Sequence, residues 1–110
     1  MSQLTTHILD TSLGRPAAGV PVALYQGAAD EFLATGLTNA DGRIADLLPA
    51  EQRLAPGIYR LQFILTGYFE SQGIPHFYPF VDIWFTVGTD AHYHVPLLLN
   101  PFGYSTYRGS

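Results

Sequence analysis

The chain ends in His92-Tyr-His-Val-Pro-Leu-Leu-Leu-Asn-Pro-Phe-Gly-Tyr-Ser-Thr-Tyr-Arg-Gly-Ser110, a sequence typical of a β-hairpin. Its first strand begins with two histidines, and Pro101 and Gly103 mark the turn before the second strand. Side chains two positions apart in a strand lie on one face of a sheet, so His92 and His94 share a face. A strand that only fills a core has little use for two imidazoles, so this face is a candidate site for chemistry.

The rest of the chain repeats this pattern of short apolar strands between glycine- and proline-rich turns, which is typical of an all-β sandwich or barrel. We predict strands near Thr5–Leu9, Val20–Gln26, Phe32–Thr38, Arg43–Asp46, Gly57–Leu65, Phe80–Val87, His92–Leu99 and Tyr104–Arg108. A threonine cap and a glycine stop predict one short helix over Thr66–Gly73. Pro49–Arg53 is expected to form a single turn at most. The length of 110 residues predicts one domain spanning residues 1–110.

Composition narrows the range of partners. The chain is 47% hydrophobic and 14% aromatic with only 13% charged residues, which favours a surface partly covered by another subunit. It has no lysine and a net charge of -4, so neither nucleic acid nor an anionic membrane is an expected partner. Cysteine is absent, which removes disulfides and thiolate chemistry. The first residues lack a signal pattern and no apolar run approaches the ~20 residues of a membrane span, so we expect a cytoplasmic protein.

The first half of the chain, taken alone, indicates only a scaffold. Asp10–Leu24, Thr38–Arg43 and Leu54–Tyr59 are similar to segments of structural β-sandwich modules, and their glycines and prolines are explained by turns. His7, in the first strand with Leu9 on the same face, could equally be a rim histidine bonded to a carbonyl. Arg43 follows the Asp41-Gly42 turn, where a solvated arginine is the simpler reading.

The C-terminal histidines and tail also allow more than one interpretation. His92 and His94 share a face with Pro96 and Leu98, and such a pair is compatible with zinc. The third ligand would then have to be His7, His76 or a carboxylate, and none has useful local spacing. In the tail Ser105, Tyr107 and Gly109 share one face, and a frayed polar terminus is the simple alternative. Ser110 lacks the Gly-x-Ser-x-Gly context of a nucleophilic serine.

These residues together resemble the 5-hydroxyisourate hydrolases, also called transthyretin-related proteins. The motifs that carry the resemblance are Thr6–Asp10, Asp41-Gly-Arg43, His92–Leu99 and the closing Gly103–Ser110, with its specific Tyr-Arg-Gly-Ser ending. The likeness extends from Leu4 to Ser110. Three positions depart from the family pattern, namely Asn100, Phe102 and His76.

The resemblance implies a transthyretin-like β-sandwich of about eight strands in two sheets with one short helix. It also implies a homotetramer built as a dimer of dimers, with active sites at the ends of a channel. His7, Arg43 and His94 match the catalytic trio, and Tyr107 and Ser110 match tail residues of the same pocket. The other expected substrate contacts are Leu9, Pro96, Leu98, Ser105 and, nearer the mouth, His92.

The implied reaction is hydrolysis of a ring amide in 5-hydroxyisourate, an intermediate of urate degradation, without cofactor or metal. A neutral imidazole, with an ordinary pKa of about 6.5, can take a proton from water at physiological pH. The planar guanidinium of Arg43 suits a urea or imide group. Which histidine is the base stays open. A transthyretin-type carrier, a structural module and a zinc-dependent hydrolase remain as rival interpretations.

Overall fold

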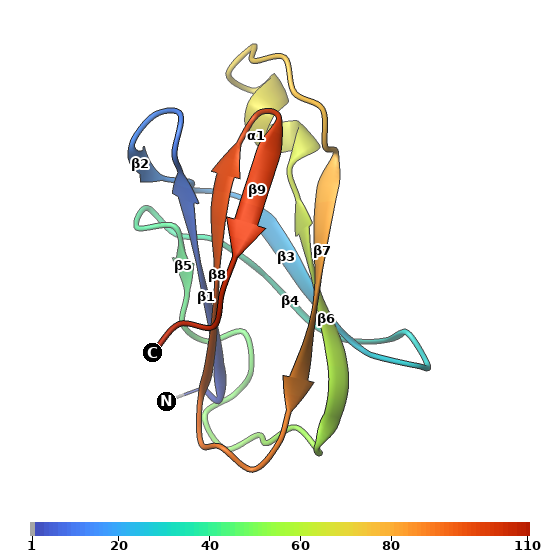
Figure 1. The fold of residues 1–110 in the computed structure, drawn as a ribbon. Helices are drawn as coiled ribbons and strands as arrows, with labels where there is room; N and C mark the ends of the chain where they lie inside the picture. The colour runs from blue at the N-terminus through green and yellow to red at the C-terminus, as the bar shows by residue number, and fades with distance from the viewer. Residues whose placement is uncertain (1) are drawn as a thin grey trace.

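The computed structural model describes residues 2–110, which form two sheets packed face to face (Figure 1). One sheet contains β1 (Leu4–Asp10), β2 (Arg15–Pro16), β5 (Arg43–Ile44), β8 (Tyr93–Asn100) and β9 (Gly103–Thr106). The other contains β3 (Pro21–Gln26), β4 (Glu31–Leu37), β6 (Gly57–Ile64) and β7 (Phe80–Val87). The short helix α1 (Thr66–Glu70) connects β6 and β7, which are neighbouring strands of the four-stranded sheet. This arrangement confirms the predicted all-β sandwich of two sheets with one helix.

A few element boundaries differ from the prediction. The helix ends at Glu70 instead of Gly73, because Gly73 adopts a positive φ of 66° and its N–H closes a turn on the Glu70 carbonyl. Leu65 takes the N-cap position, and the Thr66 hydroxyl donates to Pro79 instead of capping the helix. The segment 49–53 forms only a turn, as expected. The two-residue strand β2 was not predicted, since it is short and contains a proline.

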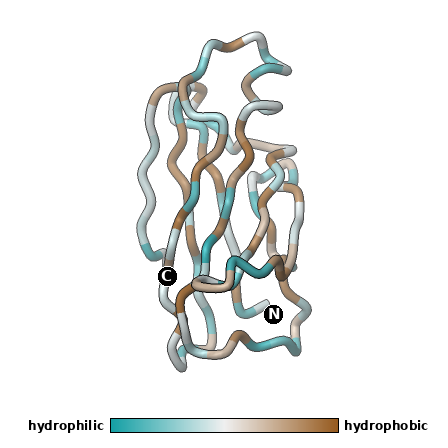
Figure 2. The backbone as a smooth tube through the Cα atoms, turned by 90° about the vertical axis from the view of Figure 1, so that its right-hand side faces the viewer, coloured by the Kyte–Doolittle hydropathy of each residue, from teal (hydrophilic) through white to brown (hydrophobic). Residues whose placement is uncertain are grey.

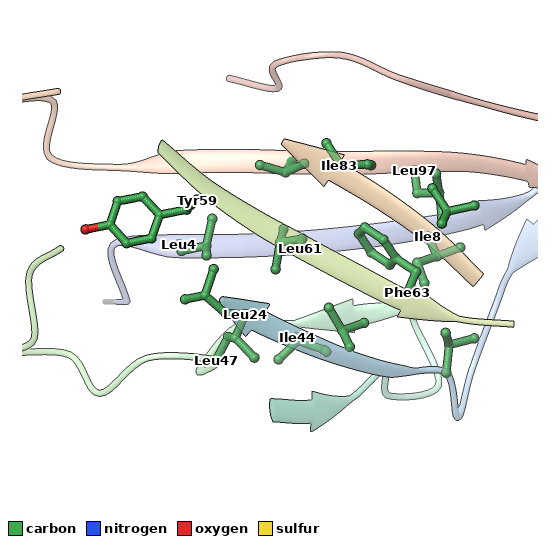
Figure 3. Packing of buried hydrophobic residues seen from close by; sticks show 14 of the residues in the cluster. Leu4, Ile8, Leu24, Ile44, Leu47, Tyr59, Leu61, Phe63, Ile83 and Leu97 are labelled. Carbon is green, nitrogen blue, oxygen red and sulfur yellow. The ribbon is translucent and has the colours of Figure 1, made fainter. Parts of the chain in front are cut away.

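The core lies between the sheets and follows from alternation along their strands. In β1 every second residue is buried, from Leu4 to Asp10, while the intervening side chains are partly exposed. Figure 2 shows hydrophobic and hydrophilic residues alternating along the backbone of several strands. Ile8 of β1, Leu24 of β3, Phe63 of β6 and Leu97 of β8 belong to one buried cluster (Figure 3). No helix within residues 2–110 is long and apolar enough to cross a membrane.

A buried carboxylate ties the end of β1 to the helix. Asp10 is fully buried, and its Oδ1 accepts hydrogen bonds from the Ser12 backbone N–H at 3.0 Å and the Ser12 hydroxyl at 2.6 Å. Its Oδ2 accepts the Tyr68 hydroxyl of α1 at 2.7 Å. Burial by itself would raise the pKa of Asp10, but the hydrogen bonds from Ser12, Tyr68 and Leu13 outweigh it and lower the pKa. Burial and the Asp10 hydrogen bond raise the pKa of Tyr68 to about 12.

Replacing Asp10 with alanine should therefore reduce the free energy of unfolding by about 2–4 kcal/mol at neutral pH, because it leaves several donors without an acceptor. The folded state lowers the pKa of Asp10, so this stabilisation is present above the unfolded pKa and is lost as pH falls through the folded pKa. Urea unfolding of both proteins across pH measures the difference, which should shrink in acid. The exposed Asp46, changed to alanine, is the control. An equal loss in both variants would contradict the role of this network.

Candidate active site

The candidate site lies on the face of the five-stranded sheet that points away from the core. β1 and β8 run parallel, and their register pairs Thr5 with His94, His7 with Pro96 and Leu9 with Leu98. Residues paired in this way project to the same side of a sheet. The antiparallel pairing of β8 with β9 adds Ser105, which lies opposite Leu98. The register therefore places these residues of β1, β8 and β9 on one face of the sheet.

Arg43 reaches this face because a tight turn delivers β5 to the edge of β1. The Gly42 N–H donates to the Asn39 carbonyl at 2.9 Å, and Asn39 Oδ1 accepts the N–H groups of Asp41 and Arg43. Gly42 has a φ of 71°, and a Cβ there would come within 2.5 Å of the Ile8 carbonyl oxygen. Glycine is thus required for the close approach. The turn sets Arg43 directly opposite His7 in the β1–β5 register.

These strands and the C-terminus enclose a cavity of about 250 Å³. Among the residues that line it are Thr5, Arg43, His92, His94 and Ser110. They come from β1, β5, β8, the residue directly before β8 and the end of the C-terminal tail. Figure 1 shows how this happens, because the red C-terminal segment runs back along β8 and ends near the start of β1.

The His94 ring is held along two of its edges. Its Nδ1 lies 2.8 Å from the Thr5 hydroxyl oxygen, which also lies 3.0 Å from Nε2 of His92. The His92 and His94 rings stack with centroids 6.4 Å apart and planes inclined by 15°. On the other edge, a Cβ at Gly109 would stand only 2.5 Å from Cδ2 of His94. Only the absent side chain of Gly109 lets the tail pass so close to the ring.

The C-terminal tail is tied down beyond the end of β9. The Gly109 N–H donates to the His94 carbonyl at 2.9 Å, forming an isolated antiparallel bridge. Arg108 pairs with the Asp90 carboxylate at 3.0 Å, and its guanidinium lies 4.7 Å from the centroid of the Tyr93 ring. The predicted strand over Tyr104–Arg108 is therefore shorter than expected, but the alternative of a frayed end does not describe this tail. These contacts bring Ser110 to the cavity.

Burial and neighbouring charge favour the neutral form of two histidines. Desolvation is the largest cause that lowers the pKa of His94, followed by the charges of Arg43, His7 and His92, while a backbone hydrogen bond with Thr5 opposes them. The pKa of His7 is also lowered, first by desolvation and then by Arg43, against the opposing effect of Asp41. Both imidazoles are therefore available as proton acceptors at neutral pH.

The structure brings only some of the predicted site residues together. His92, His94, Arg43 and Ser110 line one cavity, whereas His7 is not among its lining residues, although it lies opposite Arg43 in the β1–β5 register and its charge lowers the pKa of His94. The other predicted contacts share the outer face but lie outside the lining of the cavity: Leu9, Pro96, Leu98 and Ser105. Tyr107, 59% exposed, borders a different cavity between the tail and β7. Its role as a substrate contact stays a prediction.

No group of three or more histidine, cysteine or acidic side chains within residues 2–110 has the geometry to hold a metal ion. His92 and His94 instead face the Thr5 hydroxyl. His76 lies in the loop after α1, where its ring stacks on Phe69 with centroids 5.1 Å apart. The cavity therefore presents imidazole proton acceptors and the Arg43 guanidinium cation to a polar ligand.

Sequence reasoning missed three residues that build this site, namely Thr5, Arg108 and Gly109. Thr5 stands two positions before His7, so strand alternation alone was enough to place it on the same face. Arg108 and Gly109 belong to the quoted terminal motif, but their structural roles depend on contacts with β8. Contacts between segments that are distant in the chain leave no recognisable pattern in the local sequence.

The fold and the site define a member of the HIUase/transthyretin family, whose model matches residues 4–109. The chain belongs to this family. It is 48% identical to "5-hydroxyisourate hydrolase 2" of Rhizobium meliloti, over 98% of this chain and 96% of the relative. Among solved structures it is similar to the 5-hydroxyisourate hydrolase of Klebsiella pneumoniae, with 42% identity and a TM-score of 0.88 over 99% of this chain and all of that one. Transthyretin from Sparus aurata has a TM-score of 0.89 at 34% identity, over 99% and 97% of the two chains.

Proposed function

We propose that this protein hydrolyses 5-hydroxyisourate to 2-oxo-4-hydroxy-4-carboxy-5-ureidoimidazoline by opening a ring amide. The names of relatives that match over nearly the full chain support the substrate. The backbone similarity does not separate the two classes of the family, because the hydrolase and transthyretin structures have nearly equal TM-scores. The observation that carries the proposal is therefore the cavity that combines Arg43, His94 and Ser110.

In this mechanism His94 is the general base. Its ring lines the cavity and its pKa is lowered, so at neutral pH it can take a proton from water as the water oxygen attacks the ring carbonyl. The carbonyl carbon gains a C–O bond, the C–N bond breaks, and the proton held by the imidazole passes to the departing ring nitrogen. No cofactor takes part in these steps.

Arg43 supplies the positive charge that the reaction requires. Its guanidinium, in the same cavity, would hold the substrate by paired N–H groups and stabilise negative charge on the attacked carbonyl oxygen. His7, opposite Arg43, adds a second neutral imidazole at the edge of the site. Ser110 and His92 would orient the substrate or the water from the remaining walls.

A direct test follows the decay of freshly generated 5-hydroxyisourate by stopped-flow absorbance, with and without the protein. We expect a rate proportional to protein concentration and insensitive to a metal chelator. A rate equal to the uncatalysed decay would overturn the proposal. In that case tight thyroxine binding would favour the carrier alternative, and absence of binding would leave the structural module.

The pH profile of the reaction should report the neutral imidazoles. Because burial and Arg43 lower the pKa of His94 and His7 from 6.5, the acid limb of kcat/KM should have its midpoint below 6.5. Removing the Arg43 charge, as in Arg43→Gln, should move this limb to higher pH, since the imidazolium form is then less disfavoured. The measurement is kcat/KM against pH for both proteins. A wild-type midpoint above 6.5 would contradict the assignment.

We also propose that the protein assembles as a homotetramer. Within residues 2–110, β7 and β9 each end a sheet, and both border the cavity that contains Tyr107. Phe80 and Trp84 on β7 are about half exposed, as is Tyr104 on β9. Unpaired edges with exposed aromatic residues favour pairing with another copy. Sedimentation equilibrium should give four times the mass of one chain, and a monomer would exclude this assembly.

A further inference from the structure

The hydroxyl of Thr5 joins His92, which directly precedes β8, to His94 of β8, and it has no part in the mechanism above. Its oxygen lies 2.8 Å from Nδ1 of His94 and 3.0 Å from Nε2 of His92. Thr5 projects from β1 directly opposite His94 in the parallel register, on the side of the sheet away from the core. These two contacts are the only hydrogen bonds of this hydroxyl within residues 2–110, so its orientation is decided by the imidazoles.

The number of available protons limits the hydrogen-bonding states that the Thr5 hydroxyl and the two imidazoles can adopt. A threonine hydroxyl has one hydrogen to donate, and a neutral imidazole carries a proton on only one of its nitrogens. When the hydroxyl donates to one ring, the facing nitrogen of the other ring must carry a proton and donate to the hydroxyl oxygen. The bridge therefore links the tautomer of His92 to that of His94, and the two rings have complementary states.

The position of the His94 ring selects one of these states. Thr5 faces Nδ1, and the tail passes along Cδ2 at Gly109, so the end of the ring that carries Cε1 and Nε2 is left for the cavity. A base that acts through Nε2 must leave that nitrogen unprotonated. The His94 proton then resides on Nδ1, and the Thr5 hydroxyl donates to Nε2 of His92.

We propose that Thr5 is a positioning residue that holds His94 as its Nδ1–H tautomer, with Nε2 free to accept a proton, through a hydrogen-bonded relay to His92. The inference rests on the proposed function, because it explains how His94 is prepared as the base. In addition to its place on the cavity wall, His92 then supports that base through the Thr5 hydroxyl. When Nε2 takes a proton, the hydrogen bond from Nδ1 to Thr5 becomes charge-assisted and stronger.

Two substitutions separate the hydroxyl from the shape of the side chain. Thr5→Val removes the hydroxyl and keeps the branched side chain, and Thr5→Ser keeps the hydroxyl. We expect Thr5→Val to lower kcat by about 10- to 100-fold, by analogy with the loss of hydrogen-bond partners that orient metal-binding histidines, with little change in KM. Its acid limb should move to lower pH, because the imidazolium form loses an acceptor. Thr5→Ser should retain both kcat and the wild-type pH profile.

The matched control is Thr35→Val, in β4 of the opposite sheet, whose hydroxyl donates to the Val22 carbonyl at 3.0 Å. It should leave kcat and the pH profile unchanged. If Thr5→Val and Thr5→Ser lose activity equally, or if Thr5→Val keeps wild-type kcat, the hydroxyl has no positioning role. A purely structural role would lower the melting temperature without moving the acid limb.

The relay also has a test that does not depend on activity. Two-bond ¹H–¹⁵N correlation spectra of the wild-type protein distinguish the two tautomers of each histidine. We expect His94 as Nδ1–H and His92 as Nδ1–H, with its Nε2 accepting from Thr5, and a changed tautomer balance in Thr5→Val. Finding His94 as Nε2–H would overturn the relay even in an active enzyme. Absence of wild-type turnover would overturn the proposed function. The relay would still be tested independently, because the tautomers are measured without substrate.

Discussion

Replacing His94 with alanine should lower kcat for ring-amide hydrolysis by about 10²–10⁴-fold, the usual contribution of a general base. His94 lines the cavity beside Arg43 and Ser110, and its pKa is lowered by burial and by the neighbouring positive charge. The variant should fold, because the ring is partly exposed on the outer face of the sheet and does not belong to the core cluster. Stopped-flow turnover and far-ultraviolet circular dichroism measure the two properties.

The control for this variant is a histidine in a different setting. His76→Ala removes an imidazole from the loop after α1, where the ring contacts Phe69 and the Ile74 carbonyl. We expect His76→Ala to keep wild-type turnover. Added imidazole should restore part of the activity of His94→Ala by filling the vacated space. Near-normal turnover of His94→Ala without imidazole would remove this residue from the mechanism and make His7 the candidate base.

The second large effect is expected for Arg43. Arg43→Ala should reduce kcat by about 10²–10³-fold, because an oxyanion donor is lost from the cavity. Arg43→Lys should recover only part of this loss, since lysine keeps the charge but not the planar pair of N–H donors. Both variants should remain folded, because Arg43 is exposed and the Asn39 turn is made by backbone and Asn39 side-chain atoms.

Arg53 provides the matched control for the loss of an exposed arginine. Among residues 2–110 its guanidinium donates only to the carbonyls of Ala50 and Gln52, close to it in the chain. Arg53→Ala should therefore keep the turnover of the wild-type protein. Equal activity of Arg43→Ala and Arg53→Ala would show that the charge at position 43 does not take part in the reaction.

The strands were largely predictable because alternation is a local property of the chain. β7 was predicted with the bounds that the structure has, and β1 and β6 to within one residue at each end. The helix was less predictable, because its end depends on a positive φ at Gly73 and its start on Leu65 instead of a threonine cap. The two-residue β2 exists only because β1 offers it an edge to pair with.

The position of the C-terminal tail, residues 107–110, could not be predicted from the sequence for a different reason. Its polar, glycine-containing sequence was equally compatible with a frayed terminus, and only the resemblance to a family connected it with His94. In the structure Gly109 pairs with His94, and Arg108 pairs with Asp90, so the end of the chain is held by residues that precede and begin β8. Neither partner can be identified from the spacing of residues within the tail.

The sequence by itself determined which faces the strands bury and which side chains with useful chemistry lie on the opposite faces, because both follow from a period of two residues. Only the tertiary structure decided that β1 runs parallel to β8 with Thr5 opposite His94, and that β5 brings Arg43 opposite His7. These pairings join residues that are distant in the chain, and a shift of register by one residue would send each side chain to the other face. The site therefore depends on long-range hydrogen bonding between strands, which local patterns do not record.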